Sequence, residues 1–186
     1  VPLLPAFAVA GGVRLRLPAV RPVALAYHEA SMRRRVALRP LGSCVKCRNR
    51  WKFRPPRVGP SELEYMVMDS RGRSAAATSA IDVVMRRSSR VLSPVTGRVR
   101  SVRRYRLYGR YPDVRVAIFP QGRPDRLVVL IHLRDVRVRP GQRVVASSSV
   151  LGWPRRFRFQ SQVDRYVRGR YPHVHLEVKR PPARRN

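Results

Sequence analysis

The segment Tyr171–Val178 reads YPHVHLEV, and after the proline its polar and apolar residues alternate without interruption. Alternation with a period of two predicts a half-buried β-strand. Because side chains two residues apart leave a strand on the same face, His173, His175 and Glu177 share one side of it. Two neighbouring imidazoles can both ligate a metal, or one can ligate while the other handles a proton. The segment therefore predicts a functional site, and the alternative is a polar strand face in contact with water.

Short runs of β-forming residues recur before this segment, and each run ends at glycine, proline or aspartate. From Ser61 onward these runs are Glu64–Met68, Ala80–Met85, Gly97–Val102, Val114–Phe119, Leu127–Leu133 and Gln142–Ala146. No convincing amphipathic helix is found among them. The sequence therefore predicts one all-β domain over residues 61–180, a compact sandwich or barrel of short antiparallel strands.

Residues 1–60 have a different character, because prolines and clusters of arginine interrupt every periodic pattern. We expect a basic, poorly structured arm with at most a short helix over Ala24–Val36, and a short basic tail over residues 181–186. Cys44 and Cys47 are the only cysteines of the chain. A zinc site would need further ligands beside them, and a redox motif would need a βαβ context. We therefore interpret the pair as incidental or as a disulfide.

The charge of the chain is extreme, since 41 lysines and arginines stand against 10 aspartates and glutamates, a net charge of +31. All but three of these cations are arginine. Such a field attracts polyanions, including nucleic acid, anionic lipid and acidic cell-wall polymers. The arginine bias also fits coding from GC-rich DNA, so part of it carries no functional information.

The hydropathy of the chain bears on its location. No apolar run reaches the roughly 18 residues of a membrane-spanning helix, so we expect no transmembrane segment. Val1–Gly12 is apolar and rich in small side chains, as the remnant of a signal sequence would be. We expect a secreted or cell-envelope location in a bacterium, with a cytoplasmic location as the alternative.

Two segments centred on turns share one layout. Val91–Val99 reads VLSPVTGRV, whereas Val136–Val144 reads VRVRPGQRV and is followed by VLG at Val150–Gly152. This layout resembles the hybrid barrel of lipoyl and biotinyl domains and of the lysostaphin-type (LytM-like) zinc endopeptidases. Lipoyl and biotinyl carriers need a lysine to modify on an exposed hairpin, and no lysine lies between Phe53 and Val178. The absence of this lysine excludes the carriers.

Three further motifs resemble the endopeptidases, and the likeness extends over more than half of the chain. These proteins carry a histidine-x-histidine strand near the end of the domain, which His173 and His175 match. They also carry a histidine that follows an apolar strand and precedes leucine, as His132 does in VVLIHL. An earlier segment of the family holds a histidine and an aspartate four residues apart. Here Asp82 is in place, but Thr78 stands where that histidine belongs.

The resemblance implies a role for each residue. Asp82 and His175 would ligate zinc, and the third ligand would be missing. His132 and His173 would flank the zinc-bound water, one as general base and the other stabilising the tetrahedral intermediate. A three-ligand site lowers the pKa of that water to about 7, whereas two ligands hold the metal less well, so we expect weak or lost activity. The alternatives are a strand-end carboxylate for Asp82 and a core histidine for His132. Glu177 would orient one of the histidines, or it would be exposed to solvent or paired with an arginine.

Two functions follow from these patterns. The first is a lysostaphin-type cell-wall protein that binds peptidoglycan and cleaves its peptide cross-links, or that keeps only the binding. The second is an arginine-rich nucleic-acid or ribosome-associated protein that uses the β domain as a scaffold. For this second function, Tyr105, Tyr108 and Tyr111 lie among arginines and would form a stacking patch, unless they belong to a solvated hairpin.

Overall fold

The computed structural model describes residues 2–31, 33–47 and 54–183. These residues form strands arranged in three sheets, together with one short 3-10 helix, η1 (Gln162–Arg165). No α-helix occurs among the described residues, and they contain no helix with the length and apolar character needed to cross a membrane. The prediction of an all-β fold is confirmed.

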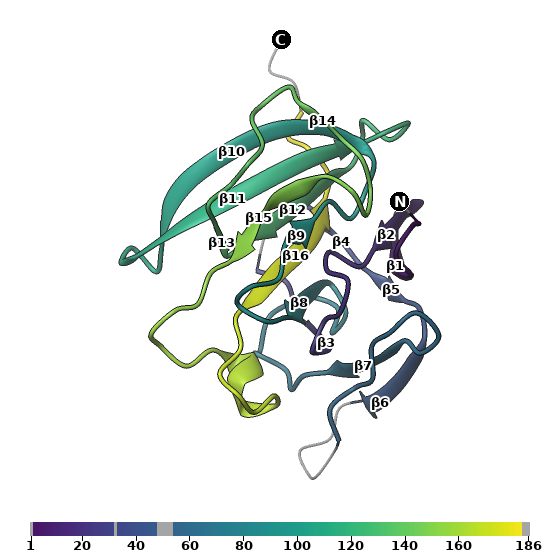
Figure 1. Cartoon of the computed structure of the whole chain (residues 1–186), viewed down its shortest axis with the longest axis vertical. Coiled ribbons are helices and arrows are strands. Elements are labelled where there is room, and N and C mark those ends of the chain that lie inside the picture. The colour runs from purple at the N-terminus through teal and green to yellow at the C-terminus, as the bar shows by residue number, and fades with distance from the viewer. Residues whose placement is uncertain (1, 32, 48–53, 184–186) are drawn as a thin grey trace.

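The largest sheet has ten strands and runs through the whole molecule (Figure 1). Its strands are β3 (Ala24–His28), β4 (Arg35–Val36), β6 (Ser43–Cys47), β7 (Glu64–Val67), β8 (Ala80–Val84), β10 (Gly97–Leu107), β11 (Tyr111–Pro120), β12 (Leu127–Ile131), β14 (Arg143–Val144) and β16 (His173–Lys179). They follow the order β14-β10-β11-β12-β16-β8-β3-β7-β6, and β4 pairs with the end of β16. Neighbouring strands are antiparallel except that β7 is parallel to both β3 and β6. The strand β16 therefore lies inside the sheet, between β12 and β8.

Two three-stranded sheets complete the fold. The first has the order β2-β1-β5 and consists of β1 (Ala6–Ala10), β2 (Val13–Arg16) and β5 (Arg39–Pro40). The second has the order β13-β15-β9 and consists of β13 (Leu133–Arg134), β15 (Val150–Pro154) and β9 (Val91–Leu92). The chain passes from the large sheet into the second small sheet at His132, where φ is 68°. Residues other than glycine seldom adopt this left-handed backbone, so His132 marks a sharp change of direction.

Every run of β-forming residues predicted between Glu64 and Val178 forms a strand at its expected place. The largest difference concerns β10 and β11, which have 11 and 10 residues. Both strands continue through the tyrosine- and arginine-rich segment and pair along it as a hairpin, with Leu107 opposite Tyr111. The hairpin projects beyond the rest of the sheet in Figure 1.

Residues 1–60 differ from the poorly structured arm that we expected. Their described part forms β1 to β6, and Phe7, Leu15 and Tyr27 are fully buried in the main core. The strand β3 occupies the start of the stretch expected to be helical and pairs with β8 inside the large sheet. Every residue of β3 is buried, so its sequence ALAYH lacks the alternation that identifies a half-buried strand. Residues 48–53 of this part, and 184–186 of the tail, lie outside the described residues.

The cysteine pair lies on β6 at the edge of the large sheet. Cys44 and Cys47 form a disulfide. Of the two interpretations, an incidental pair or a disulfide, the disulfide is confirmed.

The alternation of β16 sorts its side chains between two environments. The apolar residues pack into the main hydrophobic core: Val174, Leu176 and Val178. The polar residues face the other side of the sheet, and they too are buried: His173, His175 and Glu177. Buried polar groups need hydrogen-bond partners other than bulk water, so the partners of these three residues define the candidate site.

Candidate metal centre

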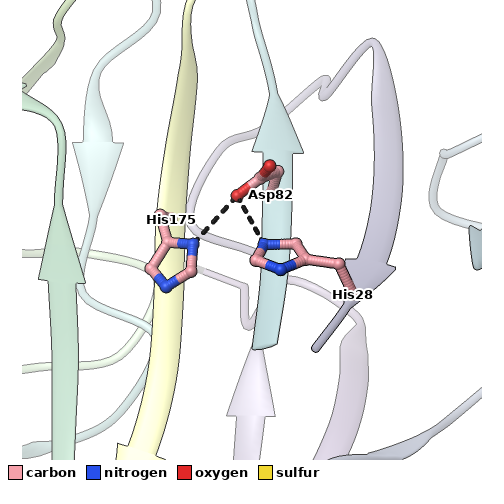
Figure 2. Close-up of side chains that lie close together, drawn as sticks. All are labelled: His28, Asp82 and His175. Atoms are coloured by element: carbon pink, nitrogen blue, oxygen red, sulfur yellow. Dashed lines mark hydrogen bonds and ion pairs between the residues drawn. The ribbon is translucent and has the colours of Figure 1, made fainter. Parts of the chain in front are cut away.

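Three neighbouring strands of the large sheet bring three possible metal ligands together. Asp82 on β8 lies directly opposite His175 on β16 and Ala26 on β3. His28 lies two residues beyond Ala26, so its side chain leaves β3 on the same face of the sheet. Figure 2 shows the side chains of His28, Asp82 and His175 directed toward one another from their three strands.

These three side chains are in direct contact and almost fully buried. Nε2 of His28 and Nδ1 of His175 each lie 3.0 Å from the same oxygen, Oδ1 of Asp82. One ligand atom from each residue lies within 4.8 Å of the other two. Burial alone would raise the pKa of Asp82, but the surrounding histidines outweigh this effect and hold the pKa well below its ordinary value. Asp82 is therefore an ionised carboxylate.

The other nitrogen of His28 determines what its Nε2 can do. Nδ1 of His28 lies 2.9 Å from the carbonyl oxygen of Glu29. A carbonyl oxygen only accepts, so Nδ1 carries a hydrogen. In this tautomer the lone pair of Nε2 is directed at Asp82, an arrangement that suits a cation shared by the two side chains.

His175 repeats this arrangement with its nitrogens exchanged. Its Nε2 lies 2.8 Å from Oε1 of Glu177, a carboxylate oxygen that accepts, so Nδ1 is the nitrogen left for Asp82. Burial alone would lower the pKa of His175, but its hydrogen bonds to Asp82 and Glu177 outweigh burial and raise the pKa to about 9. Without a metal, His175 is therefore an imidazolium between two carboxylates.

The donor set fits a small divalent cation. Two imidazole nitrogens and one carboxylate oxygen are common ligands of zinc, and zinc bonds of about 2.1 Å in a tetrahedron place ligand atoms about 3.4 Å apart. The two separations between a histidine nitrogen and Oδ1 of Asp82 are 3.0 Å, close to that spacing, and all three ligand atoms lie within 4.8 Å of one another. In protein metal sites the second nitrogen of a ligating histidine usually donates to a carbonyl or a carboxylate, as it does here at Glu29 and Glu177. These side chains could hold a metal ion.

The other two histidines lie beside this centre. Nε2 of His173 is 3.9 Å from Oδ2 of Asp82, and the ring centroids of His173 and His132 are 5.0 Å apart. Burial lowers the pKa of His173 to about 4, so this ring is neutral at pH 7. Nδ1 of His132 lies 2.8 Å from Oδ2 of the buried Asp113, which also accepts a 3.2 Å hydrogen bond from the backbone N–H of His132. All four residues selected from the sequence, Asp82, His132, His173 and His175, thus converge.

The missing third ligand is the point at which the sequence interpretation needs correction. Thr78 lies away from the centre, where its hydroxyl donates to the carbonyl oxygen of Leu38 at 2.9 Å. His28, which is 54 residues from Asp82 in the chain, occupies the place that we expected to be vacant. His28 was not selected from the sequence because it lies within residues 1–60, which we interpreted as a poorly structured arm. The one available signal was the apolar run ALAY that ends at one of only four histidines.

The centre opens into a pocket of about 470 Å³ that is lined by all the site histidines except His28. Asp82 lies in its wall together with aromatic residues and arginines: Tyr108, Phe157, Phe159, Arg71, Arg73 and Arg165. A larger hollow of about 900 Å³ lies elsewhere, between Val20 and Tyr171, and its walls contain no histidine or carboxylate. Of these two hollows, only the smaller one is lined by histidines and a carboxylate.

The tyrosines expected to stack on bases are arranged differently. The hydroxyl of Tyr105 donates to Oδ2 of Asp113 at 2.5 Å, which ties this ring to the support of His132. Tyr111 packs against Phe159 with ring centroids 4.7 Å apart. Of the three tyrosines only Tyr108 is largely exposed, at 76%. Only Tyr108 of the three lines the pocket, whereas Tyr105 and Tyr111 contact Asp113 and Phe159 beside it.

Comparison with family models, with curated proteins and with solved structures gives no significant match for this chain. The chemistry of the pocket therefore carries the functional argument.

Proposed function

We propose that this protein is a zinc-dependent peptidase of the lysostaphin type that cleaves peptide cross-links of peptidoglycan. The observation that carries the proposal is the open three-residue centre of His28, Asp82 and His175, with two further histidines beside it in one pocket. A two-ligand centre would favour lost activity, but His28 supplies the third donor. We therefore propose an active hydrolase.

His132 and His173 have separate roles in the proposed reaction. Zinc, when bound by the three ligands, supplies a water of lowered pKa and polarises the peptide carbonyl. Nδ1 of His132 donates to Asp113, which leaves Nε2 of this ring as a base able to accept the proton of the attacking water. His173 is neutral at pH 7 and keeps one N–H, so we assign to it the hydrogen bond that stabilises the oxyanion.

The arrangement of the strands supports the duplicated hybrid barrel of these endopeptidases as the finer description of the fold. The two segments with the shared turn layout lie side by side, because Gly97 pairs with Val144 and the N–H of Gly141 donates to the carbonyl of Val99 at 2.8 Å. The strand β9 of the first segment also pairs with β15, which follows the second.

The choice of substrate and location rests on charge and on the disulfide. A net charge of +31 favours an acidic polymer such as the bacterial wall. The Cys44–Cys47 disulfide favours a compartment outside the reducing cytosol. Both observations support a secreted or cell-envelope protein.

Metal content of the purified full-length protein tests this proposal. We expect one zinc per chain and cleavage of cross-linked peptidoglycan peptides. His28→Ala should lower zinc affinity at least about 100-fold, because loss of a direct ligand exceeds the 10- to 100-fold effect of losing a residue that only orients a ligand. His132→Ala should keep zinc and lose cleavage.

Thr78→Ala is the matched control, and it should leave zinc affinity unchanged because the Thr78 hydroxyl bonds to Leu38. Zinc binding that survives His28→Ala but fails in Thr78→Ala would contradict the ligand assignment. Binding of iron in preference to zinc, with no peptide cleaved, would overturn the peptidase proposal, because two histidines and a carboxylate also suit iron oxygenases.

A further inference from the structure

The pocket beside the metal centre is lined by more positive than negative charge. Arg71, Arg73 and Arg165 contribute to its wall, and Asp82 is the one acidic residue there among the described residues. In the proposed function Asp82 is a metal ligand, so its charge is more than compensated when a divalent ion binds. A ligand that enters this pocket therefore meets a positive environment, which favours an anionic group.

Arg71 is the arginine nearest to the centre. One of its terminal nitrogens lies 3.9 Å from Oδ2 of Asp82, beyond hydrogen-bond distance, and its side chain is 25% exposed. Its Nε donates to the side-chain oxygen of Gln162. Apart from this 3.9 Å ion pair with Asp82, the two terminal nitrogens make no polar contact with any described residue, so their N–H groups can donate to a ligand.

Several contacts hold Arg71 in this position. The carboxylate of Glu29 accepts hydrogen bonds from the backbone N–H groups of Arg71 at 3.0 Å and Arg73 at 2.9 Å. The hydroxyl of Ser70 donates to the same carboxylate at 2.5 Å. From the other side, Gln162 donates to the carbonyl of Asp69 at 2.9 Å. Because the loop is fixed before a ligand arrives, little conformational entropy is lost on binding.

We infer that Arg71 binds a carboxylate of the substrate close to the scissile peptide bond. The planar fork of a guanidinium matches a carboxylate with two parallel hydrogen bonds, which gives both affinity and orientation. The inference rests on the proposed peptidase function and specifies its substrate: a peptide with an anionic group beside the cleaved bond. This group is either a free C-terminal carboxylate or an acidic side chain.

Peptide binding to the full-length, zinc-loaded His132→Ala protein tests the inference, because this variant should bind peptides without cleaving them. One pair of probes is acetyl-Lys-D-Ala-D-Ala with a free or an amidated C-terminus. The second pair is an amidated peptide with an internal Glu or Gln. We expect one carboxylate probe to bind about 10- to 100-fold more tightly than its neutral partner, the range for a hydrogen bond to a charged group. The pair that shows this difference identifies the source of the carboxylate.

Arg71→Gln in the same background should abolish that difference while zinc content and thermal unfolding stay unchanged. Arg71→Lys should restore only part of it, because an ammonium keeps the charge but not the fork. Arg104→Gln is the matched control, since Arg104 is exposed on β10 and outside the pocket, and it should keep the full difference.

Equal binding of the carboxylate and neutral probes to the His132→Ala protein, in which Arg71 is intact, would overturn the inference. An equal loss of affinity for both members of a pair in Arg71→Gln, or a loss of zinc, would also overturn it and assign Arg71 to the support of Asp82. If the protein binds no zinc and cleaves no peptide, the proposed function fails, and the probe pairs on the metal-free protein still decide whether Arg71 selects a carboxylate.

Discussion

At the scale of single residues, Glu177 is a buried carboxylate in contact with His175. Its side chain is fully buried, and one carboxylate oxygen, Oε2, has no hydrogen bond among the described residues. An unsatisfied buried oxygen destabilises a fold, so packing does not explain its presence. Its other oxygen receives the Nε2 hydrogen of His175 at 2.8 Å, which orients this ring toward Asp82.

We therefore expect Glu177→Gln to lower zinc affinity about 10- to 100-fold, the usual effect of losing a residue that orients a metal-ligating histidine. Competition with a chromophoric chelator measures this change. Glu62→Gln is the control, because Glu62 is exposed and forms a 3.5 Å ion pair with Arg57. Unchanged zinc affinity in Glu177→Gln would mean that His175 is oriented by its own strand alone.

At the scale of elements, alternation in the sequence located the strands that have one polar face, and β16 with its two histidines is the clearest case. It failed for β3, since a strand that is buried throughout has no polar face to reveal its period. Asp82 and His175 were recognised through motifs that are local in sequence. The contact between Asp82 and His28 depends on the pairing of β3 with β8, which no local pattern records.

The short helix η1 shows how one element positions another. Asp164 accepts hydrogen bonds from Arg156 at 2.8 Å and from the backbone N–H of Ser161 at 2.8 Å. These contacts hold the start of η1, where Gln162 contacts Arg71. Burial alone would raise the pKa of Asp164, but these hydrogen bonds outweigh burial and lower it.

A carboxyl group whose pKa is lowered by folding stabilises the protein above its unfolded pKa of about 3.9 and loses that contribution as the pH falls. Asp164→Asn should therefore reduce the free energy of unfolding by about 1–2 kcal/mol at pH 7, and the difference from wild type should shrink below about pH 4. Urea unfolding across this pH range measures it. Asp135→Asn, at an exposed ion pair with Arg134, should change stability by under about 1 kcal/mol. A difference for Asp164→Asn that does not depend on pH would contradict the role of its charge.

At the scale of the whole molecule, the N-terminal part belongs to the core and not to a separate arm. Phe7 on β1 has no exposed surface and packs in the same cluster as the apolar face of β16. Its carbonyl oxygen accepts a 2.9 Å hydrogen bond from the hydroxyl of the buried Tyr27. The site therefore depends on N-terminal residues that lie outside the segment resembling the lysostaphin-type endopeptidases.

Phe7→Ala should reduce the free energy of unfolding by about 3–5 kcal/mol, the usual cost of emptying a buried aromatic position. Leu3→Ala is the control, because Leu3 is 57% exposed and exposed substitutions usually change stability by about 0.5 kcal/mol or less. Thermal or chemical unfolding measures both variants. Equal stabilities would restore the view of a dispensable arm.

The spacing of the three ligands along the chain has a consequence for how the proposed hydrolase comes into being. His28 and Asp82 are separated by 54 residues, and Asp82 and His175 by 93. His175 lies on β16, the last strand among the described residues. A nascent chain without β16 carries only two of the ligands and cannot assemble the centre. Under the proposed function, the hydrolase would therefore stay inert during synthesis and would begin to act only when β16 has entered the sheet.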